Sequence, residues 1–202
     1  YNAIMNSVSI LDDKNTKKSK GEIPKLLSDA LGVSFDSHIG HDYINDYNER
    51  YDFYHKVENR VSFDIDILNK ITKGGLPIKT LNVIMAGTGV GKSLFMCHMA
   101  SSCISQGDNV LYITMEMAEE KIAERIDANL LNISLNELRS VSKDDYENKF
   151  QVLRAKTQGK LIIKEYPTAS ASTLHFRALL SELAMKKQFR PNIIFVDYIN
   201  IC

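Results

Sequence analysis

Hydrophobic and polar positions change their spacing along the chain after about Ser62. Beyond this point, short apolar runs typical of buried strands alternate with longer stretches whose apolar residues recur at helical spacing. The pattern predicts strands at 80–86, 109–115, 160–165 and 192–197, and helices at 92–105, 118–131, 143–157 and 172–187. Such alternation is typical of a parallel sheet with helices on both faces. The predicted fold class is therefore α/β.

The first third of the chain has a different pattern. Residues 12–20 are polar and charged without periodicity, which predicts a flexible linker. A helix is predicted over 23–31, where apolar side chains recur at i, i+3, i+4, i+7 and i+8, namely Ile23, Leu26, Leu27, Ala30 and Leu31. A second helix is predicted over 42–56 with a stripe of Ile44, Tyr47, Tyr51 and Tyr54. We interpret this stripe as core packing rather than as a surface that stacks on bases.

Composition and charge narrow the function classes. Lys plus Arg and Asp plus Glu are 25 each, so the formal net charge of +0 gives no overall attraction for nucleic acid. DNA binding would have to come from a local patch. No apolar run has the length of a membrane span and no secretory leader is visible. Cys97, Cys103 and Cys202 lack metal-ligand spacing and predict reduced, mostly buried thiols in a cytoplasmic protein. His98 is predicted to be a packing residue rather than a ligand.

The stretch between predicted strand 80–86 and predicted helix 92–105 is glycine-rich and predicts a phosphate-binding loop. It comprises Ala86, Gly87, Thr88, Gly89, Val90, Gly91, Lys92 and Ser93. Such a loop directs backbone N–H groups at an anion, and its glycines let the backbone approach without Cβ clashes. We predict that Lys92 reaches the β- and γ-phosphates of ATP and that the Ser93 hydroxyl holds Mg²⁺. Only the first position departs from G-x-x-x-x-G-K-[ST], because Ala86 replaces glycine.

Two acidic residues follow predicted strands at the carboxyl edge of the sheet, where ligands bind in such folds. Asp197 ends the apolar run Ile-Ile-Phe-Val, a Walker B pattern in which a buried strand delivers a carboxylate. This carboxylate can hold Mg²⁺ through water or orient Ser93. Glu116 follows another strand and can polarise the attacking water toward the γ-phosphate. Spacing alone equally allows Glu116 to be a first-turn acid of the helix that follows.

Several segments resemble the DnaB family of replicative helicases, most closely its T-even-phage type. The matching segments are 31–42, 67–75, 115–120, 125–129 and 194–199. The resemblance implies a RecA-like fold and a ring of six identical subunits around single-stranded DNA. It implies that ATP binds between subunits and that hydrolysis drives translocation and unwinding at the replication fork. Primase and a helicase loader would be partners, and the location would be the cytoplasm, that of the host for a phage protein.

Residue roles carry over by position from the same resemblance. Lys92 and Ser93 would bind phosphate and Mg²⁺, Glu116 would activate water, and Asp197 would support Mg²⁺. Arg125 matches a family position and is assigned a structural or phosphate-proximal role. The resemblance also divides the chain into a flexible linker, a helical linker region that docks on a neighbouring subunit, and a partial RecA-like ATPase domain. These parts are 1–20, 21–62 and 63–202.

The two ends of the chain suggest a piece of a longer protein, because it begins at Tyr1 and stops at Cys202 soon after a strand. In the family, a further strand, the DNA-binding loops and an arginine finger follow the Walker B strand. We therefore expect a gap in the sheet between 80–86 and 192–197, or a gap filled by another chain. An arginine finger contributes roughly 10³–10⁵ in rate, so this chain alone should hydrolyse ATP slowly.

Other functions fit parts of the pattern. A RecA/RadA-type recombinase or a KaiC-like ATPase shares the loop, the sheet and the acids, but the predicted helix over 23–31 favours the helicase. A nucleotide-gated assembly fragment without catalysis would dock that helix in a partner's groove. An exposed apolar face on the helix would favour this last function. A small-molecule kinase is least favoured, because the sequence shows no lid or acceptor-site signature.

Overall fold

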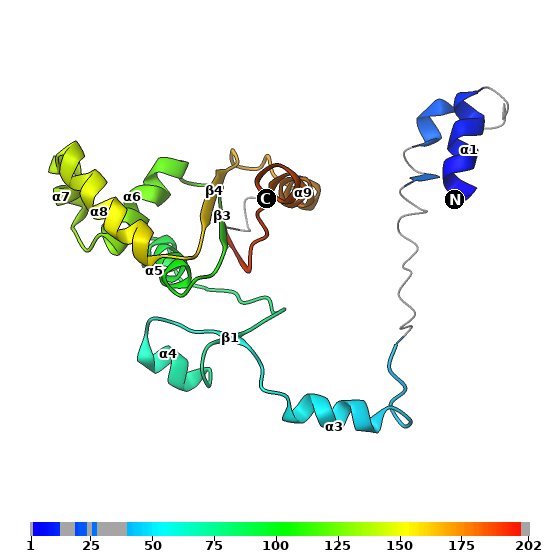
Figure 1. Cartoon of the computed structure of the whole chain (residues 1–202), viewed down its shortest axis with the longest axis horizontal. Helices are drawn as coiled ribbons and strands as arrows, with labels where there is room; N and C mark the ends of the chain where they lie inside the picture. Colours follow the sequence, from blue (N-terminus) through cyan, green and yellow to red (C-terminus); the bar gives the residue numbers. More distant parts are fainter. Residues whose placement is uncertain (1, 13–18, 24–25, 28–39, 199–202) are drawn as a thin grey trace. The chain divides into compact units, whose positions relative to one another are not determined.

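The computed structural model describes residues 2–12, 19–23, 26–27 and 40–198 (Figure 1). The chain divides into two compact units, residues 1–57 and residues 58–202. Each unit is described by itself below. None of the helices in the described ranges combines the length and apolar character that crossing a membrane would need.

The N-terminal unit contains a helix where a flexible linker was predicted. Asn2–Leu11 form α1, so the prediction of a linker over 1–20 is wrong for this part. The physical reason is that the segment lacks Gly and Pro and carries apolar residues at helical spacing, with Ile10 only 2% exposed. A short 3₁₀ turn, η1, spans Lys20–Glu22. The helix predicted over 23–31 lies mostly outside the described residues.

The tyrosine stripe of the N-terminal unit is on the surface. Tyr47–His55 form α3, as the pattern predicted. However, the side chains of the stripe are exposed by 60–73%, namely Ile44, Tyr47, Tyr51 and Tyr54. The prediction of core packing is therefore wrong in the described part of the chain. The rings contact local neighbours instead, and the Tyr51 ring lies 4.2 Å from the His55 ring between centroids.

The C-terminal unit is built around a parallel sheet. Among the described residues three strands pair in the order β4–β3–β5, which are Leu161–Glu165, Val110–Thr114 and Ile193–Asp197. The register places Tyr112 between Ile163 of β4 and Phe195 of β5. All five residues of β3 are buried. The central strand is therefore the core of this unit, and β5 carries Asp197 at its carboxyl end.

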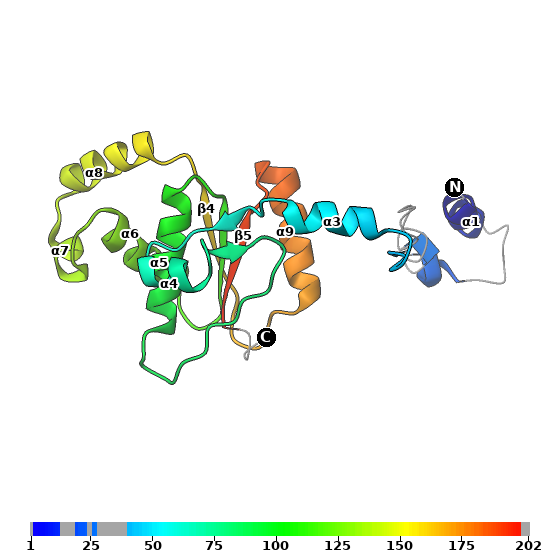
Figure 2. The same cartoon turned by 90° about the horizontal axis from the view of Figure 1, so that it is seen from below.

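Helices cover both faces of this sheet, as predicted (Figure 2). On one face Val110 and Tyr112 of β3 pack in a cluster with α5 (Lys92–Ser105) and α6 (Glu119–Leu130). On the other face Leu111 and Ile113 pack with α9 (Thr173–Lys187). Alternate residues of a strand point to opposite faces, so a single apolar strand supplies both halves of the core.

Several short elements complete this unit. β1 (Arg60–Val61) pairs antiparallel with β2 (Leu76–Pro77), and α4 (Asp66–Ile71) lies between them in the chain. α7 (Leu135–Ser140) precedes the predicted helix α8 (Lys143–Lys156). The sequence pattern did not predict β1, β2, α4 or α7, because each is only two to six residues long. Elements of this length offer too few periodic positions to read.

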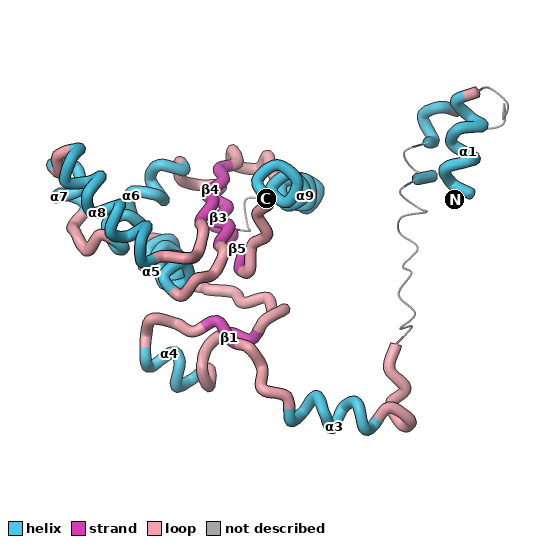
Figure 3. The backbone as a smooth tube through the Cα atoms, in the orientation of Figure 1, coloured by secondary structure: helices cyan, strands magenta, loops and turns pink. Residues whose placement is uncertain are grey.

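The predicted strand over 80–86 is not formed, and this corrects the sequence analysis. The segment between β2 and α5 is loop (Figure 3), and residues 81–90 are exposed throughout. Leu81 and Met85 are 85% and 88% exposed. A strand is stable only when its backbone groups are paired, and in the described part of the chain β5 pairs with β3 alone. Among the described residues the sheet therefore ends at β5, and the gap expected between strands 80–86 and 192–197 is not observed because the first of these strands is not formed.

Candidate nucleotide-binding site

The glycine-rich loop leads directly into the N-terminus of α5. Gly91 is the residue before the helix, with φ 104° and ψ 24°, a left-handed conformation that favours glycine. Gly89 also has a positive φ of 73°, and open space surrounds both positions. The Gly91 carbonyl accepts the first helical bond from the Phe95 amide at 2.9 Å. The loop thus presents the unpaired N–H groups of a helix N-terminus to solvent, which suits an anion.

The Lys92 ammonium lies over the loop that precedes it. Its Nζ donates hydrogen bonds to the carbonyl oxygens of Ala86 and Gly87, both at 3.0 Å. These contacts fold the side chain back across the loop rather than out into solvent. A phosphate placed over the loop would meet this cation together with the backbone N–H groups. Ser93 follows as the second residue of α5 and is partly buried.

Asp197 is buried and belongs to a short chain of hydrogen bonds. It is 1% exposed, and its Oδ2 accepts a hydrogen bond from the Tyr112 hydroxyl at 2.9 Å. The Cys97 thiol on α5 contacts the same hydroxyl, with 3.9 Å between Sγ and Oη. Burial raises the pKa of Tyr112 above its usual value, so the phenol stays a donor. The carboxylate therefore has a fixed position against the face covered by α5.

Glu116 is exposed, and the residues on either side of it, Met115 and Met117, are held by hydrogen bonds. The Met115 amide donates to the Asp197 carbonyl at 2.8 Å, and the Met115 carbonyl accepts from Thr168 Oγ1 at 2.9 Å. Thr114 Oγ1 accepts from the Met117 amide at 3.1 Å and donates to the Met117 carbonyl at 2.8 Å. The backbone around Glu116 is thus held while its side chain faces solvent. This arrangement suits a group that must orient a water molecule.

The two acids lie at the same edge of the sheet. β3 and β5 are neighbours, and the register pairs Thr114 with Asp197. Glu116 therefore stands just beyond the strand end beside Asp197. Ser93 is four residues before Cys97 on α5, so the two share a helix face, and Cys97 touches Tyr112 beneath Asp197. The structure thus links the start of α5 to the acidic edge through buried contacts.

The donor atoms suit a magnesium ion that is shared with a nucleotide. Ser93 offers a hydroxyl and Asp197 a carboxylate, which are the hard oxygen donors that Mg²⁺ prefers. Within the described ranges no three His, Cys, Asp or Glu side chains gather closely enough to hold a metal by themselves. Magnesium commonly binds through one or two protein oxygens, water and substrate phosphates. The residues present fit that mode of binding.

A cavity of about 570 Å³ lies beside the loop, between α5 and α6. Its lining includes Gly91, His98, Arg125 and Asn129. His98 Nδ1 lies 3.0 Å from the Asn129 amide nitrogen, and its Nε2 lies 3.8 Å from the Asp64 carboxylate. Both ring nitrogens of His98 thus lie near polar groups of the protein, and its role as a packing residue rather than a ligand stays a prediction. Arg125 lines the same cavity as Gly91 of the loop, and its phosphate-proximal or structural role stays a prediction.

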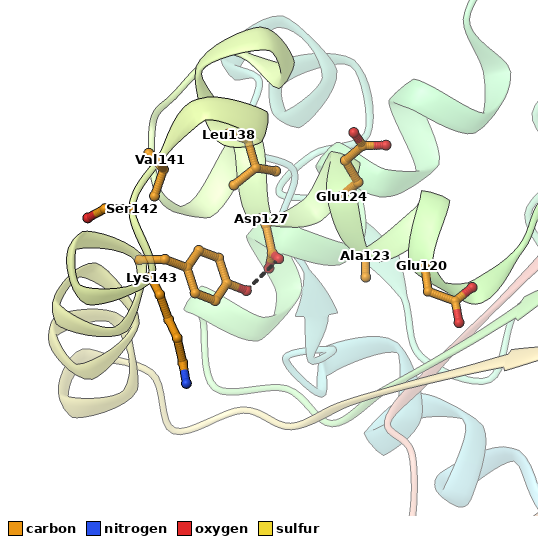
Figure 4. Close-up of a pocket in the computed structure, with 9 residues that line it drawn as sticks. Glu120, Ala123, Glu124, Asp127, Leu138, Val141, Ser142 and Lys143 are labelled. Atoms are coloured by element: carbon orange, nitrogen blue, oxygen red, sulfur yellow. Dashed lines mark hydrogen bonds between the residues drawn. The ribbon is translucent and has the colours of Figure 1, made fainter.

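A second cavity, of about 450 Å³, lies among α6, α7 and α8 (Figure 4). Its wall contains the hydrogen bond from the Tyr146 hydroxyl to Asp127 Oδ2 at 2.8 Å. Burial raises the pKa of the Asp127 carboxyl above its usual value. Its lining contains none of the residues predicted to bind phosphate or magnesium. This cavity is therefore separate from the candidate nucleotide site.

Sequence reasoning missed the side chains that support the acids. Tyr112, Thr114 and Thr168 were placed in or near strands without a role. One signal was available for Tyr112, because a tyrosine within the buried strand Val-Leu-Tyr-Ile-Thr must find a partner for its hydroxyl. The cysteine prediction holds for Cys97 and Cys103, which are free and buried. Burial raises the pKa of the Cys103 thiol to about 12. Cys202 lies outside the described residues.

Comparisons with known proteins agree with these features. Residues 61–202 match the DnaB-like helicase C terminal domain family. The chain is 48% identical over 204 residues to a DnaB-like replicative helicase of Enterobacteria phage T4, covering 98% of this chain and 43% of the relative. It is also 28% identical over 151 residues to the DNA repair protein RadA of Campylobacter jejuni, covering 69% of this chain and 33% of that relative. The chain thus spans less than half the length of either relative.

A solved structure supports the fold. It is described as the structure of a DnaB-like replicative helicase and its interactions with primase, and it matches with a TM-score of 0.58. The match covers 98% of this chain and 46% of the other, at 17% sequence identity. The parallel sheet with helices on both faces is therefore a RecA-like core. On the family match and the similarity to the phage protein, this chain belongs to the family of DnaB-like replicative helicases.

Proposed function

We propose that this chain is the nucleotide-binding part of the motor of a replicative DNA helicase and that it binds Mg²⁺–ATP at the loop 86–93. The observation that carries the proposal is the continuous arrangement of loop, helix and acidic strand edge. Left-handed Gly91 starts α5, Lys92 lies over the loop, and Cys97 of α5 contacts the Tyr112 hydroxyl that holds Asp197. A site for a nucleotide and its magnesium ion needs a helix N-terminus and a lysine for the phosphates, and a carboxylate for the ion.

Each residue has a distinct task in the proposed site. The backbone of Ala86, Gly87, Thr88, Gly89, Val90 and Gly91 surrounds the phosphates. Lys92 exchanges its two carbonyl contacts for phosphate oxygens, which are stronger partners because they are charged. Ser93 and Asp197 hold magnesium, the latter through water, and the bound ion neutralises charge on the phosphates. Glu116 accepts a hydrogen bond from the attacking water and orients it.

The isolated chain should bind nucleotide but hydrolyse it slowly. Residues 81–90 are exposed and form no strand, so within the described ranges the loop has no strand of the sheet directly before it. Electrostatic catalysis depends on groups that are fixed before the reaction begins, and a loosely held loop loses this advantage. The arginine finger that the family supplies from a neighbour would add roughly 10³–10⁵ in rate. Robust DNA-stimulated ATP turnover by these 202 residues alone would contradict the proposal.

For the whole protein we propose the activity of the family. Six subunits would form a ring around single-stranded DNA, and ATP hydrolysis would drive translocation and unwinding at the fork. The region 21–62 would dock on a neighbouring subunit, and primase and a helicase loader would bind elsewhere. The phage relative, 48% identical over 98% of the chain, supports this proposal more strongly than the RadA relative supports a recombination ATPase.

Calorimetric titration of Mg²⁺–ATP into the chain tests the proposal. Binding by the wild-type chain and its loss in Lys92→Ala is the expected result. Lys121→Ala is a matched control, because this lysine pairs with Glu124 on α6, away from the loop. Equal binding by all three proteins would place the nucleotide elsewhere. Binding by none of them would show that the loop does not form a site in this chain.

A further inference from the structure

Tyr112 has an unusual position for a polar side chain. It is the middle residue of the central strand and has no exposed surface. Its ring lies 5.9 Å from the Phe195 ring between centroids, in a stacked arrangement within the core beneath α5 and α6. A phenylalanine would fill the same space without bringing a hydroxyl into the core. Burying a hydroxyl is unfavourable unless it finds a partner.

The hydroxyl of Tyr112 points at the carboxylate that ends the neighbouring strand. It donates to Asp197 Oδ2 at 2.9 Å. On its other side the Cys97 Sγ–H donates weakly to the phenol oxygen, at 3.9 Å. Because the phenol oxygen accepts from α5, its own proton is directed to the carboxylate. The hydrogen bonds therefore run from the Cys97 thiol to the Tyr112 oxygen and from the Tyr112 hydroxyl to the Asp197 carboxylate, which accepts.

This chain of contacts joins the two elements that would hold the cation. Cys97 is four residues after Ser93 on α5, so both lie on the same face of the helix. Asp197 is at the end of β5, and Tyr112 on β3 lies between them. Hydrogen bonds from outer residues commonly orient the carboxylates that bind metals. Tyr112 has the position and the donor for this task.

We infer that Tyr112 is a positioning residue for magnesium binding, which holds the Asp197 carboxylate in the orientation that receives the ion's water. The inference rests on the proposed function, because it assumes that nucleotide and magnesium bind together at this site. The bond occupies one lone pair of Oδ2 and leaves the rest of the carboxylate for the water. Without the phenol, the carboxylate can turn, and magnesium loses affinity while the phosphate loop is unchanged.

The test compares nucleotide affinity with and without metal. A fluorescent, non-hydrolysable ATP analogue is titrated into the chain in EDTA and again in saturating Mg²⁺. The metal ratio is the dissociation constant in EDTA divided by the dissociation constant in Mg²⁺. Tyr112→Phe should reduce this ratio by roughly tenfold or more, the size typical for outer partners of metal ligands. The dissociation constant in EDTA should stay within about twofold, because the loop residues remain in place.

Two further variants separate positioning from general damage. Tyr146→Phe is the matched control, since it removes the same kind of phenol–carboxylate bond, to Asp127, from the cavity among α6, α7 and α8. It should leave the metal ratio unchanged. Cys97→Ala removes the weak donor to the phenol but keeps the bond between Tyr112 and Asp197. Its metal ratio should therefore stay close to that of the wild-type chain. Circular dichroism confirms that each variant is folded before it is titrated.

The possible results are distinguishable. An unchanged metal ratio in Tyr112→Phe would overturn the inference and leave the proposed function intact. A loss of affinity that is equal in EDTA and in Mg²⁺ would also overturn it, because Tyr112 would then serve the core alone. A wild-type chain that binds the analogue equally well without metal would overturn both the inference and the role of Asp197. A wild-type chain that does not bind the analogue, and so resembles Lys92→Ala, would overturn the proposed function and the inference with it.

Discussion

The two halves of the candidate site are built in opposite ways. At the acidic edge, Thr114 and Asp197 are at most 1% exposed, and the Met115 amide bonds to the neighbouring strand. At the phosphate loop, residues 81–90 are all exposed, and the loop leads directly into α5. Asp197 in the acidic half therefore belongs to the most buried part of the unit, whereas the Glu116 side chain and the phosphate loop are exposed.

This difference shows that different interactions hold the acidic residues and the phosphate-binding loop. The Asp197 carboxylate and the backbone around Glu116 depend on the pairing of β3 with β5 and on the hydroxyl groups of neighbouring residues, so both are held whenever the core is folded. The loop depends on the start of one helix and on two carbonyl contacts from Lys92. We therefore expect the loop to gain order when phosphate binds, whereas the acidic edge is already in place.

Hydrogen exchange should show the largest difference. The amides of β3 (Val110–Thr114) lie in the buried central strand and should exchange only through global opening. The amides of 81–90 should exchange at nearly unprotected rates. We expect protection factors that differ by at least about 10³ at neutral pH, measured by mass spectrometry of overlapping peptides. Comparable protection in the two segments would show that the loop is held as firmly as the central strand.

Two glycine substitutions should differ in their effect on stability. A Cβ at Gly159 would overlap the carbonyl oxygens of Ile104 and Asp108, where α5 and β4 meet the core. Gly159→Ala should lower the free energy of unfolding by about 2–3 kcal/mol through overpacking. Gly89→Ala meets open space and only its positive φ opposes it, so the loss should be no more than about 1 kcal/mol. Urea unfolding of both variants measures this pair, and a larger loss in Gly89→Ala would reverse the contrast.

The sequence predicted the regular parts of this fold better than its irregular parts. The strands around β3 and the helices α5, α6, α8 and α9 follow from apolar runs and helical spacing. The strand over 80–86 was wrong, because an apolar pattern shows that a segment can be a strand but not that a partner is present. The prediction that the tyrosine stripe of α3 packs in a core was wrong for the same reason. Apolar side chains at helical spacing need a surface to pack against, and spacing does not supply it.

The candidate site was predicted unevenly. The loop residues and the two acids follow from motifs, because phosphate and magnesium require those side chains at those strand and helix ends. The supporting hydroxyls of Tyr112, Thr114 and Thr168 were not predicted. Their roles depend on which strands are neighbours and on the register between them, such as Thr114 with Asp197. Strand order and register cannot be predicted from the apolar pattern of a single sequence.

Thr114→Val should have an intermediate effect. The buried Thr114 hydroxyl makes both side-chain hydrogen bonds that hold Met117, and valine keeps its shape without the hydroxyl. The substitution should lower the free energy of unfolding by about 1–2 kcal/mol, because the Met117 amide loses its partner. It should also speed hydrogen exchange at Met117. Thr168→Val is the matched control on the Met115 side. A neutral Thr114→Val variant would show that the loop around Glu116 is held by other contacts.

Lys92→Met should have the smallest effect on stability. Among the described residues its ammonium bonds to the carbonyls of Ala86 and Gly87 in the exposed loop, and methionine keeps most of the aliphatic stem. Removing contacts at the surface usually changes the free energy of unfolding by less than about 0.5 kcal/mol. Thermal unfolding without nucleotide should therefore be nearly the same for the variant and the wild type. A loss above about 1 kcal/mol would mean that Lys92 braces the fold itself. In that case a loss of nucleotide binding in Lys92 variants would no longer report on phosphate contact alone.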